Sequence, residues 1–334
     1  MDEKKIPIEV PQEKYISYCD FDGKDITIKY GDKKKIALLF VCLNTRYWPY
    51  LTNIINDAKV HFLPHHNVNY LIWSDMPSDI TYERGIIFPT EAVEWPMPTL
   101  MRYHLFLQQE EKLKEYDYIF YLDADMRIVD FVGDEILGEG LTVAEHPMYA
   151  MRKEYIPPYE PNVNSAAYVP RVGQVINDQG KSRFKPVYAA GGFQGGKTEL
   201  FIEAMKTMKE NIDKDFAQNY VAIWNDESHW NKYLFDYKGE MLVLSPSYVY
   251  PDSLIKEYYE PIWGKSLLPK IITLTKPFTL SKEGGEHIKQ FLGVQNKFTC
   301  PTCKDILEIA GHRIDSVVEC LGSGKPHQCS MTKI

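Results

Sequence analysis

The sequence predicts an α/β fold built on a Rossmann-like sheet flanked by helices, and two observations support this prediction. Its strands are short and continuously apolar, as they are in parallel sheets that are buried on both faces. They alternate with segments of helical periodicity, which is the pattern of a sheet whose neighbouring strands are joined through helices. The chain has 334 residues, 44% of them hydrophobic and 25% charged, so it can form one large or two small globular domains.

The predicted elements of the first half begin after a polar stretch, residues 1–35, which we expect to be an N-terminal extension. Ile36–Cys42 is apolar throughout and predicts a buried strand. A helix over 48–62 is predicted next, because its apolar residues fall on one helical face. The remaining predictions of this half are a strand at 68–73, a helix at 99–115 and a strand at 116–122.

The second half contains a short predicted strand at 141–144 and predicted helices at 198–213 and 226–237. Residues 152–187 are rich in Pro, Asn, Tyr and Gly and lack periodicity, so we expect a long loop there. Beyond about Lys282 the composition changes, and the last fifty residues carry four of the six cysteines. We therefore expect residues 283–334 to be a separate, cysteine-containing appendage.

Charge and composition exclude some classes of partner. The net charge of −8 argues against binding to nucleic acid or to anionic membranes, both of which need a basic surface. Met1 to Lys5 are charged and no apolar segment of the secretory type follows them. No apolar run is long enough to span a bilayer, and six cysteines are too few for a disulfide scaffold. We expect a cytoplasmic protein without a membrane span, and the sequence predicts no oligomeric state.

Two carboxylates, Asp123 and Asp125, come directly after the predicted strand at 116–122. In open α/β sheets, ligands bind beyond the carboxyl ends of the strands. Two carboxylates one residue apart can hold Mg²⁺ or Mn²⁺ and leave coordination positions for water and phosphate oxygens. Such a cation would neutralise a leaving diphosphate. An acidic turn without a metal accounts for this motif about equally well.

Two further segments carry groups that are suited to ligand binding. Residues 189–196 are rich in glycine but lack the Walker lysine spacing, so a close approach of backbone to ligand and a plain tight turn both stay open. Trp224, Asp226 and Glu227 place two acids beside an aromatic residue at the start of a predicted helix. Taken alone, this second segment fits an ordinary helix N-terminus with favourable acids.

Together these motifs resemble the family 6 retaining glycosyltransferases, which include the histo-blood-group A and B transferases and the α-1,3-galactosyltransferase. The resemblance covers about residues 37–282, and its most specific parts are residues 123–137, 190–196, 224–234 and 243–248. It implies a GT-A-type fold with a mixed Rossmann-like sheet and a catalytic domain at 36–282. A nucleotide-binding half would cover about 36–135 and an acceptor-binding half about 136–282. The lack of the animal enzymes' membrane anchor suggests a microbial or viral member.

The resemblance implies a role for each residue that matches a family motif. Asp123 and Asp125 match the Mn²⁺-binding pair. Glu227 matches the central carboxylate on the β-face of the donor sugar, and Asp226 matches the neighbour that binds donor hydroxyls. Residues implied to bind the donor nucleotide, diphosphate or sugar are Tyr47, Arg102, Ala190, Gly192, Lys276 and Lys282. Those implied to contact the acceptor are His146 and Trp224.

The implied reaction is transfer of GalNAc or Gal from a UDP-sugar to a galactose-type hydroxyl of an oligosaccharide in α-1,3 linkage, with Mn²⁺ or Mg²⁺. Glu227 would form a covalent glycosyl intermediate or stabilise an oxocarbenium-like species. By analogy with the family, Gly192 favours UDP-GalNAc, although a roomy pocket rarely excludes the smaller sugar. Two alternatives stay open: a retaining transferase for another nucleotide sugar, and a catalytically idle sugar- or partner-binding module on this fold.

The cysteines of the C-terminal appendage allow two interpretations. Cys300 and Cys303 have the spacing of a zinc-ligand pair, and further cysteines and histidines follow them. A second Cys-x-x-Cys pair is missing, so structural Zn²⁺ is balanced by the alternative of free cysteines in a small helical piece.

Overall fold

The computed structural model divides the chain into two compact units, one formed by residues 33–275 and one by residues 1–32 with 276–334. The structure describes in full residues 32–150, 157–170, 187–253 and 268–275, and it describes five further strands by their backbone alone. The predicted domain boundaries at residues 35 and 282 stay predictions. In the ranges just given, no helix is both long and apolar enough to cross a membrane.

The described residues of the smaller unit form short antiparallel strands. β1 (Tyr15–Cys19) pairs with β2 (Asp25–Lys29). β13 (Gln295–Thr299) pairs with both β14 (Ile306–Ala310) and β15 (Thr332–Lys333). The described part of the tail is therefore β-structure, and not the helical piece considered as the alternative to a zinc site.

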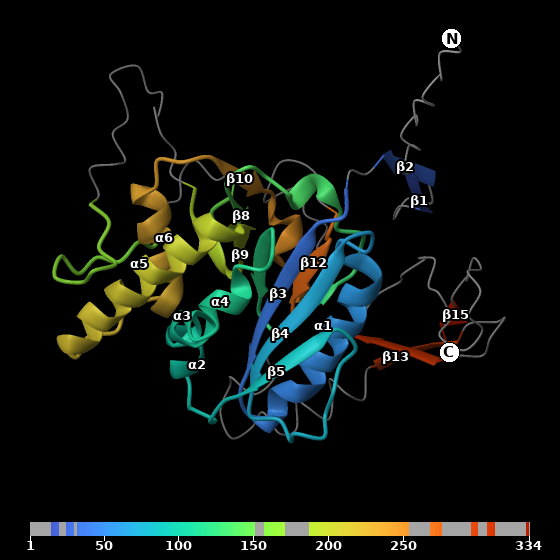
Figure 1. Cartoon of the computed structure of the whole chain (residues 1–334), viewed down its shortest axis with the longest axis horizontal. Coiled ribbons are helices and arrows are strands. Elements are labelled where there is room, and N and C mark those ends of the chain that lie inside the picture. Colours follow the sequence, from blue (N-terminus) through green and yellow to red (C-terminus); the bar gives the residue numbers. More distant parts are fainter. Residues whose placement is uncertain are drawn as a thin grey trace, which may run out of the picture. The chain divides into compact units, whose positions relative to one another are not determined.

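The larger unit is built on a seven-stranded sheet with the order β10-β8-β9-β6-β3-β4-β5, drawn in Figure 1. Four adjacent strands run parallel: β3 (Lys35–Cys42), β4 (Asn67–Ser74), β5 (Gly85–Pro89) and β6 (Tyr118–Leu122). β9 (Ala189–Lys197) runs antiparallel to β6 and β8 (Leu141–Glu145), and β10 (Met241–Leu244) is parallel to β8. The predicted α/β class with a mixed Rossmann-like sheet is confirmed.

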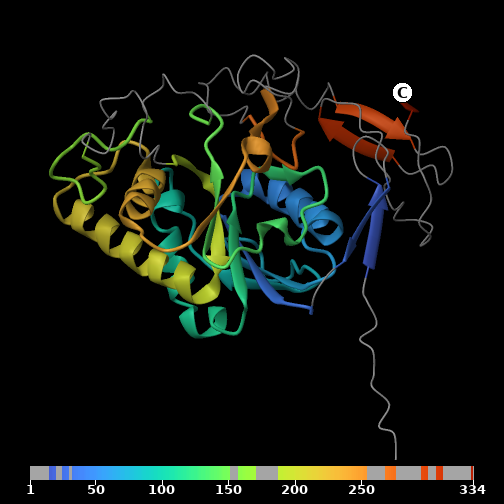
Figure 2. The same cartoon turned by 90° about the horizontal axis from the view of Figure 1, so that it is seen from above.

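Helices cover both faces of this sheet, as Figures 1 and 2 show. Side chains alternate between the two faces along a strand, so a strand buried on both sides must be apolar throughout. In β3, Phe40 belongs to the core that contains the apolar face of α1 (Trp48–His61). Leu39 belongs to the opposite core, which contains residues of α5 (Thr198–Ala217) and α6 (Asn225–Asp236). The continuous apolar pattern thus predicts β3 correctly.

The helix predicted over 99–115 is wrong in its continuity. The chain forms three short helices instead: α2 (Met97–Leu100), α3 (Arg102–Leu107) and α4 (Glu110–Leu113). The buried residues Leu100, Tyr103 and Phe106 recur every three positions, whereas one face of an α-helix repeats every 3.6 residues. The break at Met101 keeps these side chains on the same core, and it places Arg102 at the start of α3.

The glycine-rich segment 189–196 is not a tight turn but most of the strand β9, which lies between β8 and β6 inside the sheet. The glycines are required by close packing against the neighbouring strands. A Cβ at Gly195 would lie 2.5 Å from the carbonyl oxygen of Ile119 on β6, and Gly196 has φ +136°. A glycine-rich strand between bulky neighbours therefore escapes recognition by propensity, which disfavours glycine in strands.

The predicted loop at 152–187 is described over residues 157–170, where the backbone forms turns and one isolated β-bridge, between Glu160 and Tyr168. A second, three-stranded sheet has the order β11-β12-β7, and it consists of Tyr250–Pro251, Ile271–Thr273 and Met126–Ile128. Because β7 follows Asp125 directly, this small sheet brings residues 271–275 beside the carboxyl end of β6.

Candidate active site

The candidate site lies where β6 ends and β9 passes beside it. The N–H of Asp123 donates to the carbonyl oxygen of Gly192 at 3.1 Å, so the first carboxylate of the predicted pair is held against β9. Helix α6 approaches the same strand, because the N–H of Gly191 donates to Oε2 of Glu227 at 2.8 Å. Residues 123, 191 and 227, far apart in sequence, therefore meet beyond the carboxyl end of β6. Ligand sites of α/β folds lie in this position.

Arg102 is the buried centre of this arrangement, with only 2% of its surface exposed. Its Nε lies 3.3 Å from Oδ2 of Asp226, and its Nη2 lies 3.4 Å from Oδ1 of the same carboxylate. Nη2 is also 3.6 Å from Oδ1 of Asp123. Burial alone would lower the pKa of Arg102, but the charges of Asp226 and Asp123 raise it above its ordinary value. The guanidinium thus stays charged and links two predicted site carboxylates.

The peptide of Gly191 connects this guanidinium to Glu227. Its carbonyl oxygen accepts from Nη1 of Arg102 at 3.2 Å and from Nε2 of Gln194 at 3.1 Å. Its N–H donates in the opposite direction, to Glu227. A Cβ at Gly191 would lie 3.1 Å from Cβ of Glu227, so glycine lets the strand and helix approach.

Asp226 and Glu227 occupy the first turn of α6, directly after Asn225, which has φ +51°. Burial raises the pKa of Asp226 to about 6, with Arg102 opposing the shift. Burial also raises the pKa of Glu227 to about 7, and the hydrogen bonds from Gly191 and Tyr188 oppose it. The two adjacent acids therefore differ in partners: Asp226 pairs with a cation, whereas Glu227 accepts only neutral donors in the described structure.

The predicted metal pair begins with a restrained carboxylate. Oδ1 of Asp123 accepts from the hydroxyl of Tyr121 at 2.5 Å, while Oδ2 faces Gly192. Asp125 is 3% exposed, and its carbonyl oxygen accepts from the N–H of Leu274 at 3.1 Å. Asp125 is therefore held beside the last described residues before position 276.

Tyr47, predicted to bind the donor nucleotide, lies on the turn η1 (Thr45–Tyr47), which follows the carboxyl end of β3. Burial raises its pKa, and the negative charge of Asp123 is among the further causes. The turn is held by Asp75, whose Oδ1 accepts from the N–H of Asn44 at 3.0 Å and from Nε1 of Trp48 at 3.0 Å. Asp75 was missed in the sequence, although it follows the apolar strand 68–73 as Asp123 follows its own strand.

The two predicted acceptor residues both precede Glu227 in the sequence and differ in exposure. Trp224 is 48% exposed at the start of α6, and its carbonyl oxygen accepts from the N–H of Glu227. His146 follows β8 and is partly buried, and this burial lowers its pKa to about 4. Its ring contacts Tyr188 edge-on, with centroids 5.7 Å apart. Of the predicted pocket residues on β9, Ala190 is 7% exposed and precedes Gly191.

Four predicted residues lie outside the described residues. Lys276 and Lys282, predicted to contact the diphosphate, follow the described segment 268–275. Cys300 and Cys303, the predicted zinc pair, come after β13 in the sequence and also lie outside the described residues. Their roles stay predictions.

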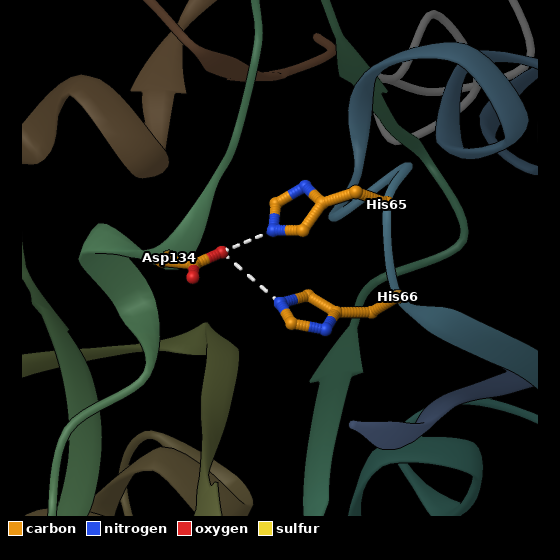
Figure 3. A group of neighbouring side chains, drawn as sticks. All are labelled: His65, His66 and Asp134. Carbon is orange, nitrogen blue, oxygen red and sulfur yellow. Dashed lines mark hydrogen bonds and ion pairs between the residues drawn. The ribbon is translucent and has the colours of Figure 1, made fainter. Parts of the chain in front are cut away.

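His65, His66 and Asp134 form the one group of three metal-ligating side chains found within the described part of the chain (Figure 3). Nε2 of His65 and Nε2 of His66 lie 2.5 and 3.0 Å from the same oxygen, Oδ1 of Asp134. The N–H of Lys34 donates to Nδ1 of His66, so the proton of the neutral ring is on Nε2. A protonated Nε2 has no lone pair for a metal, and a ligating histidine donates a hydrogen bond from its other ring N–H, whereas Nδ1 of His66 accepts one. The cluster is therefore a hydrogen-bonded link between the turn after α1 and η2 (Asp134–Ile136).

The mixed sheet, with paired carboxylates following β6, has the architecture of a GT-A-type glycosyltransferase. A family model described as Glycosyltransferase family 6 matches residues 16–259. The chain therefore belongs to glycosyltransferase family 6, and the resemblance seen in the sequence is confirmed.

Individual relatives agree with this assignment. The chain is 32% identical to histo-blood group ABO system transferase 1 of Rattus norvegicus over 219 residues, 63% of this chain and 59% of the relative. It is 30% identical to globoside alpha-1,3-N-acetylgalactosaminyltransferase 1 of Gallus gallus over 218 residues, 62% and 59% of the two chains. It is 25% identical to O-antigen biosynthesis glycosyltransferase WbnI of Escherichia coli over 226 residues, 65% and 88%. The chain thus spans about three fifths of the first two relatives.

Proposed function

We propose that this protein is a retaining hexosyltransferase that moves GalNAc or Gal from a UDP-sugar to a galactose-type hydroxyl in α-1,3 linkage. Membership of the family supports glycosyl transfer, and the name of the Gallus gallus relative supports GalNAc and the α-1,3 linkage. Nucleotide-sugar donor and glycan acceptor would be its two substrates.

The observation that carries the proposal is the position of Arg102 between Asp123 and Asp226, with Glu227 attached to the same strand through Gly191. A fixed cation beside two carboxylates suits a reaction in which negative charge develops on a leaving diphosphate. The adjacent Glu227 suits the stabilisation of positive charge on the anomeric carbon. Neither group is needed to bind a sugar passively.

The residues present also fit a divalent cation beside Asp123. Its Oδ2 faces the position where a Cβ at Gly192 would lie at 2.9 Å, so glycine keeps this side of the carboxylate open. Carboxylate oxygens are the ligands that Mn²⁺ and Mg²⁺ prefer. We propose that Asp123 and Asp125 hold the ion. When bound, such an ion would neutralise charge on the diphosphate of UDP.

In the proposed reaction, Tyr47 stacks on the uracil and Arg102 binds the diphosphate and the donor sugar. Asp226, held by Arg102, accepts hydrogen bonds from sugar hydroxyls. In one route Glu227 displaces UDP from the anomeric carbon, and the acceptor oxygen then displaces Glu227. In the other, Glu227 stabilises an oxocarbenium-like species while the acceptor oxygen attacks from the face that UDP leaves. In both routes UDP departs with the electron pair of the broken bond, and its diphosphate takes up the proton of the acceptor hydroxyl. His146 and Trp224 contact the acceptor. Lys276 and Lys282 add positive charge at the diphosphate.

The donor preference is proposed to be UDP-GalNAc over UDP-Gal, because glycine at position 192 and alanine at 190 leave room at the sugar. The crowding around Gly192 adds a constraint: a Cβ there would also lie 2.5 Å from Cε of Met126. A larger residue at 192 would therefore displace Asp123 as well as fill the sugar pocket.

The proposal is tested by measuring UDP release from UDP-GalNAc, UDP-Gal and UDP-glucose, each with Mn²⁺ and with a chelator. A galactose-terminated acceptor is added in parallel, and the product linkage is determined by NMR. We expect metal-dependent release that the acceptor accelerates, and an α-1,3 product. Turnover of UDP-glucose alone would indicate a transferase for another nucleotide sugar. No turnover of any donor would support the idle binding module.

A further inference from the structure

The carboxylate of Glu227 has one hydrogen-bond donor on each oxygen. The N–H of Gly191 lies 2.8 Å from Oε2, and the hydroxyl of Tyr188 lies 2.9 Å from Oε1. Gly191, near the start of β9, lies 36 residues before Glu227, and Tyr188, directly before β9, lies 39 residues before it. With both oxygens held, the plane of the carboxylate is set by β9, although Glu227 belongs to α6.

The Tyr188 side chain is itself held in one orientation. It is 2% exposed, and the rings of His146, Tyr149 and Tyr159 surround it with centroid distances of 5.7, 5.2 and 5.3 Å. All three contacts are edge-on, the geometry that aromatic pairs prefer. The backbone is tied as well, because the N–H of His146 donates to the carbonyl oxygen of Tyr188 at 2.8 Å. The hydroxyl therefore reaches Glu227 from a preorganised ring.

We propose that Tyr188 is a positioning residue that orients the Glu227 carboxylate and keeps it ionised for the glycosyl-transfer step. This inference rests on the proposed function, in which the ionised Glu227 faces the anomeric carbon. Tyr188 contributes a hydrogen bond from outside the residues that the family resemblance assigns.

The direction of the hydrogen bond follows from the environment of the hydroxyl. Burial raises the pKa of Tyr188 well above its ordinary value, and the charge of Glu227 raises it further. Tyr188 therefore keeps its proton and acts as a donor. Its bond favours the carboxylate form of Glu227, whereas burial and the charges of Asp226 and Asp123 favour the protonated form. Loss of the hydroxyl leaves the N–H of Gly191 as the single described hydrogen bond that lowers the pKa of Glu227.

Two matched variants isolate this bond. Tyr188→Phe removes the hydroxyl that contacts Glu227 and keeps the ring in its aromatic cluster. Tyr159→Phe removes a neighbouring buried hydroxyl that has no hydrogen-bond partner in the described structure. Because both variants delete one buried hydroxyl from the same cluster, general effects on packing are shared. Only the first removes a donor from the carboxylate.

The first measurement is independent of turnover: the pKa of Glu227, followed by NMR of proteins with ¹³C-labelled glutamate and assigned with Glu227→Gln. We expect the pKa to rise in Tyr188→Phe and to stay at the wild-type value in Tyr159→Phe. An unchanged pKa in Tyr188→Phe overturns the proposal, whatever the activity.

The second measurement is the pH profile of UDP release. Tyr188→Phe removes a hydrogen bond to a charged group, and such bonds are stronger than those between neutral groups. We therefore expect kcat to fall roughly ten- to hundred-fold in this variant, with little change in the donor KM. The acidic limb of the profile should move to higher pH, which a loss of folded protein alone would not produce. A pKa shift in Tyr188→Phe, with no turnover even in the wild type, would refute the proposed function and retain the positioning bond. Normal wild-type turnover with identical profiles in both variants would refute the positioning role alone.

Discussion

Arg102 and Asp226 form a buried ion pair, with Nε and Oδ2 separated by 3.3 Å and both side chains at most 5% exposed. The two residues lie 124 positions apart in the sequence, so the pair ties α3 to the first turn of α6. Because the same guanidinium reaches Asp123, the geometry of the residues that follow β6 and of the Glu227 helix depends on one side chain.

Removal of this guanidinium should therefore be costly. Arg102→Met leaves Asp226 buried without its cation, and we expect a loss of about 3–5 kcal/mol in the free energy of unfolding. Urea denaturation measures it, and the double variant Arg102→Met with Asp226→Asn should recover part of the loss. Lys209→Met, which breaks an exposed pair with Asp213, is the control and should cost less than about 1 kcal/mol. Equal losses in the two single variants would contradict the buried-pair account.

Stability should depend on pH through Glu227. Its pKa rises from 4.5 to about 7 on folding, so between these values the folded state holds a proton that the unfolded state has lost. This stabilising effect is complete below about pH 4.5 and disappears as the pH rises through 7. Glu227→Gln lacks the buried charge, so its Tm should exceed the wild-type value at pH 8 and approach it near pH 4.5. A difference in Tm that does not vary with pH would show that burial of the charge is not its cause.

Gly192→Ala should weaken metal binding. The new Cβ would lie 2.9 Å from Oδ2 of Asp123 and 2.5 Å from Cε of Met126, so the carboxylate must move. We expect the affinity for Mn²⁺, measured by electron paramagnetic resonance with UDP present, to fall several-fold. Gly138→Ala is a control with similar crowding, 2.9 Å from Cβ of Leu242 and outside the proposed site. Unchanged Mn²⁺ affinity with an altered donor ratio would assign Gly192 to the sugar alone.

Asp75→Ala should lower the affinity for UDP. Its carboxylate holds both the N–H of Asn44 and the indole of Trp48, on the turn that carries Tyr47. Without it, the turn loses the hydrogen bonds that position the proposed uracil-stacking ring, and we expect roughly ten-fold weaker binding by calorimetry. Asp79→Ala, which changes an exposed aspartate on the same connection, should bind UDP as the wild type does. Equal affinities in both variants would remove Tyr47 from the donor site.

The fold was predictable where the pattern of apolar residues within one segment is enough to determine the structure of that segment. The apolar run in β3 and the amphipathic α1 needed no knowledge of their neighbours. β9 could not be recognised, because its glycines are explained only by the atoms of β6 that lie against them, such as the carbonyl oxygen of Ile119. The break between α2 and α3 has the same origin, since it keeps Leu100, Tyr103 and Phe106 on a common core.

For the site, local motifs pointed to the acids but not to the groups that orient them. Asp123 and Asp125 end a strand, and Glu227 begins a helix, which are signals within a few residues. Tyr188 contacts Glu227 across 39 residues and Asp75 contacts Asn44 across 31, so neither partner is visible in a sequence pattern. Resemblance brought Arg102 and Asp226 into one site, and the structure supplies the distance between them.

Glu227 is the centre of the proposed mechanism, and its replacement is the most direct test. UDP release from UDP-GalNAc with Mn²⁺ and a galactose-terminated acceptor should be compared in wild type and Glu227→Gln, each also with chelator. Glutamine can accept from Gly191 and donate to Tyr188, so the fold is retained while the charge is lost. The account predicts metal-dependent turnover in the wild type and at least about a hundred-fold lower kcat in the variant. A Glu227→Gln protein that releases UDP at the wild-type rate would contradict it.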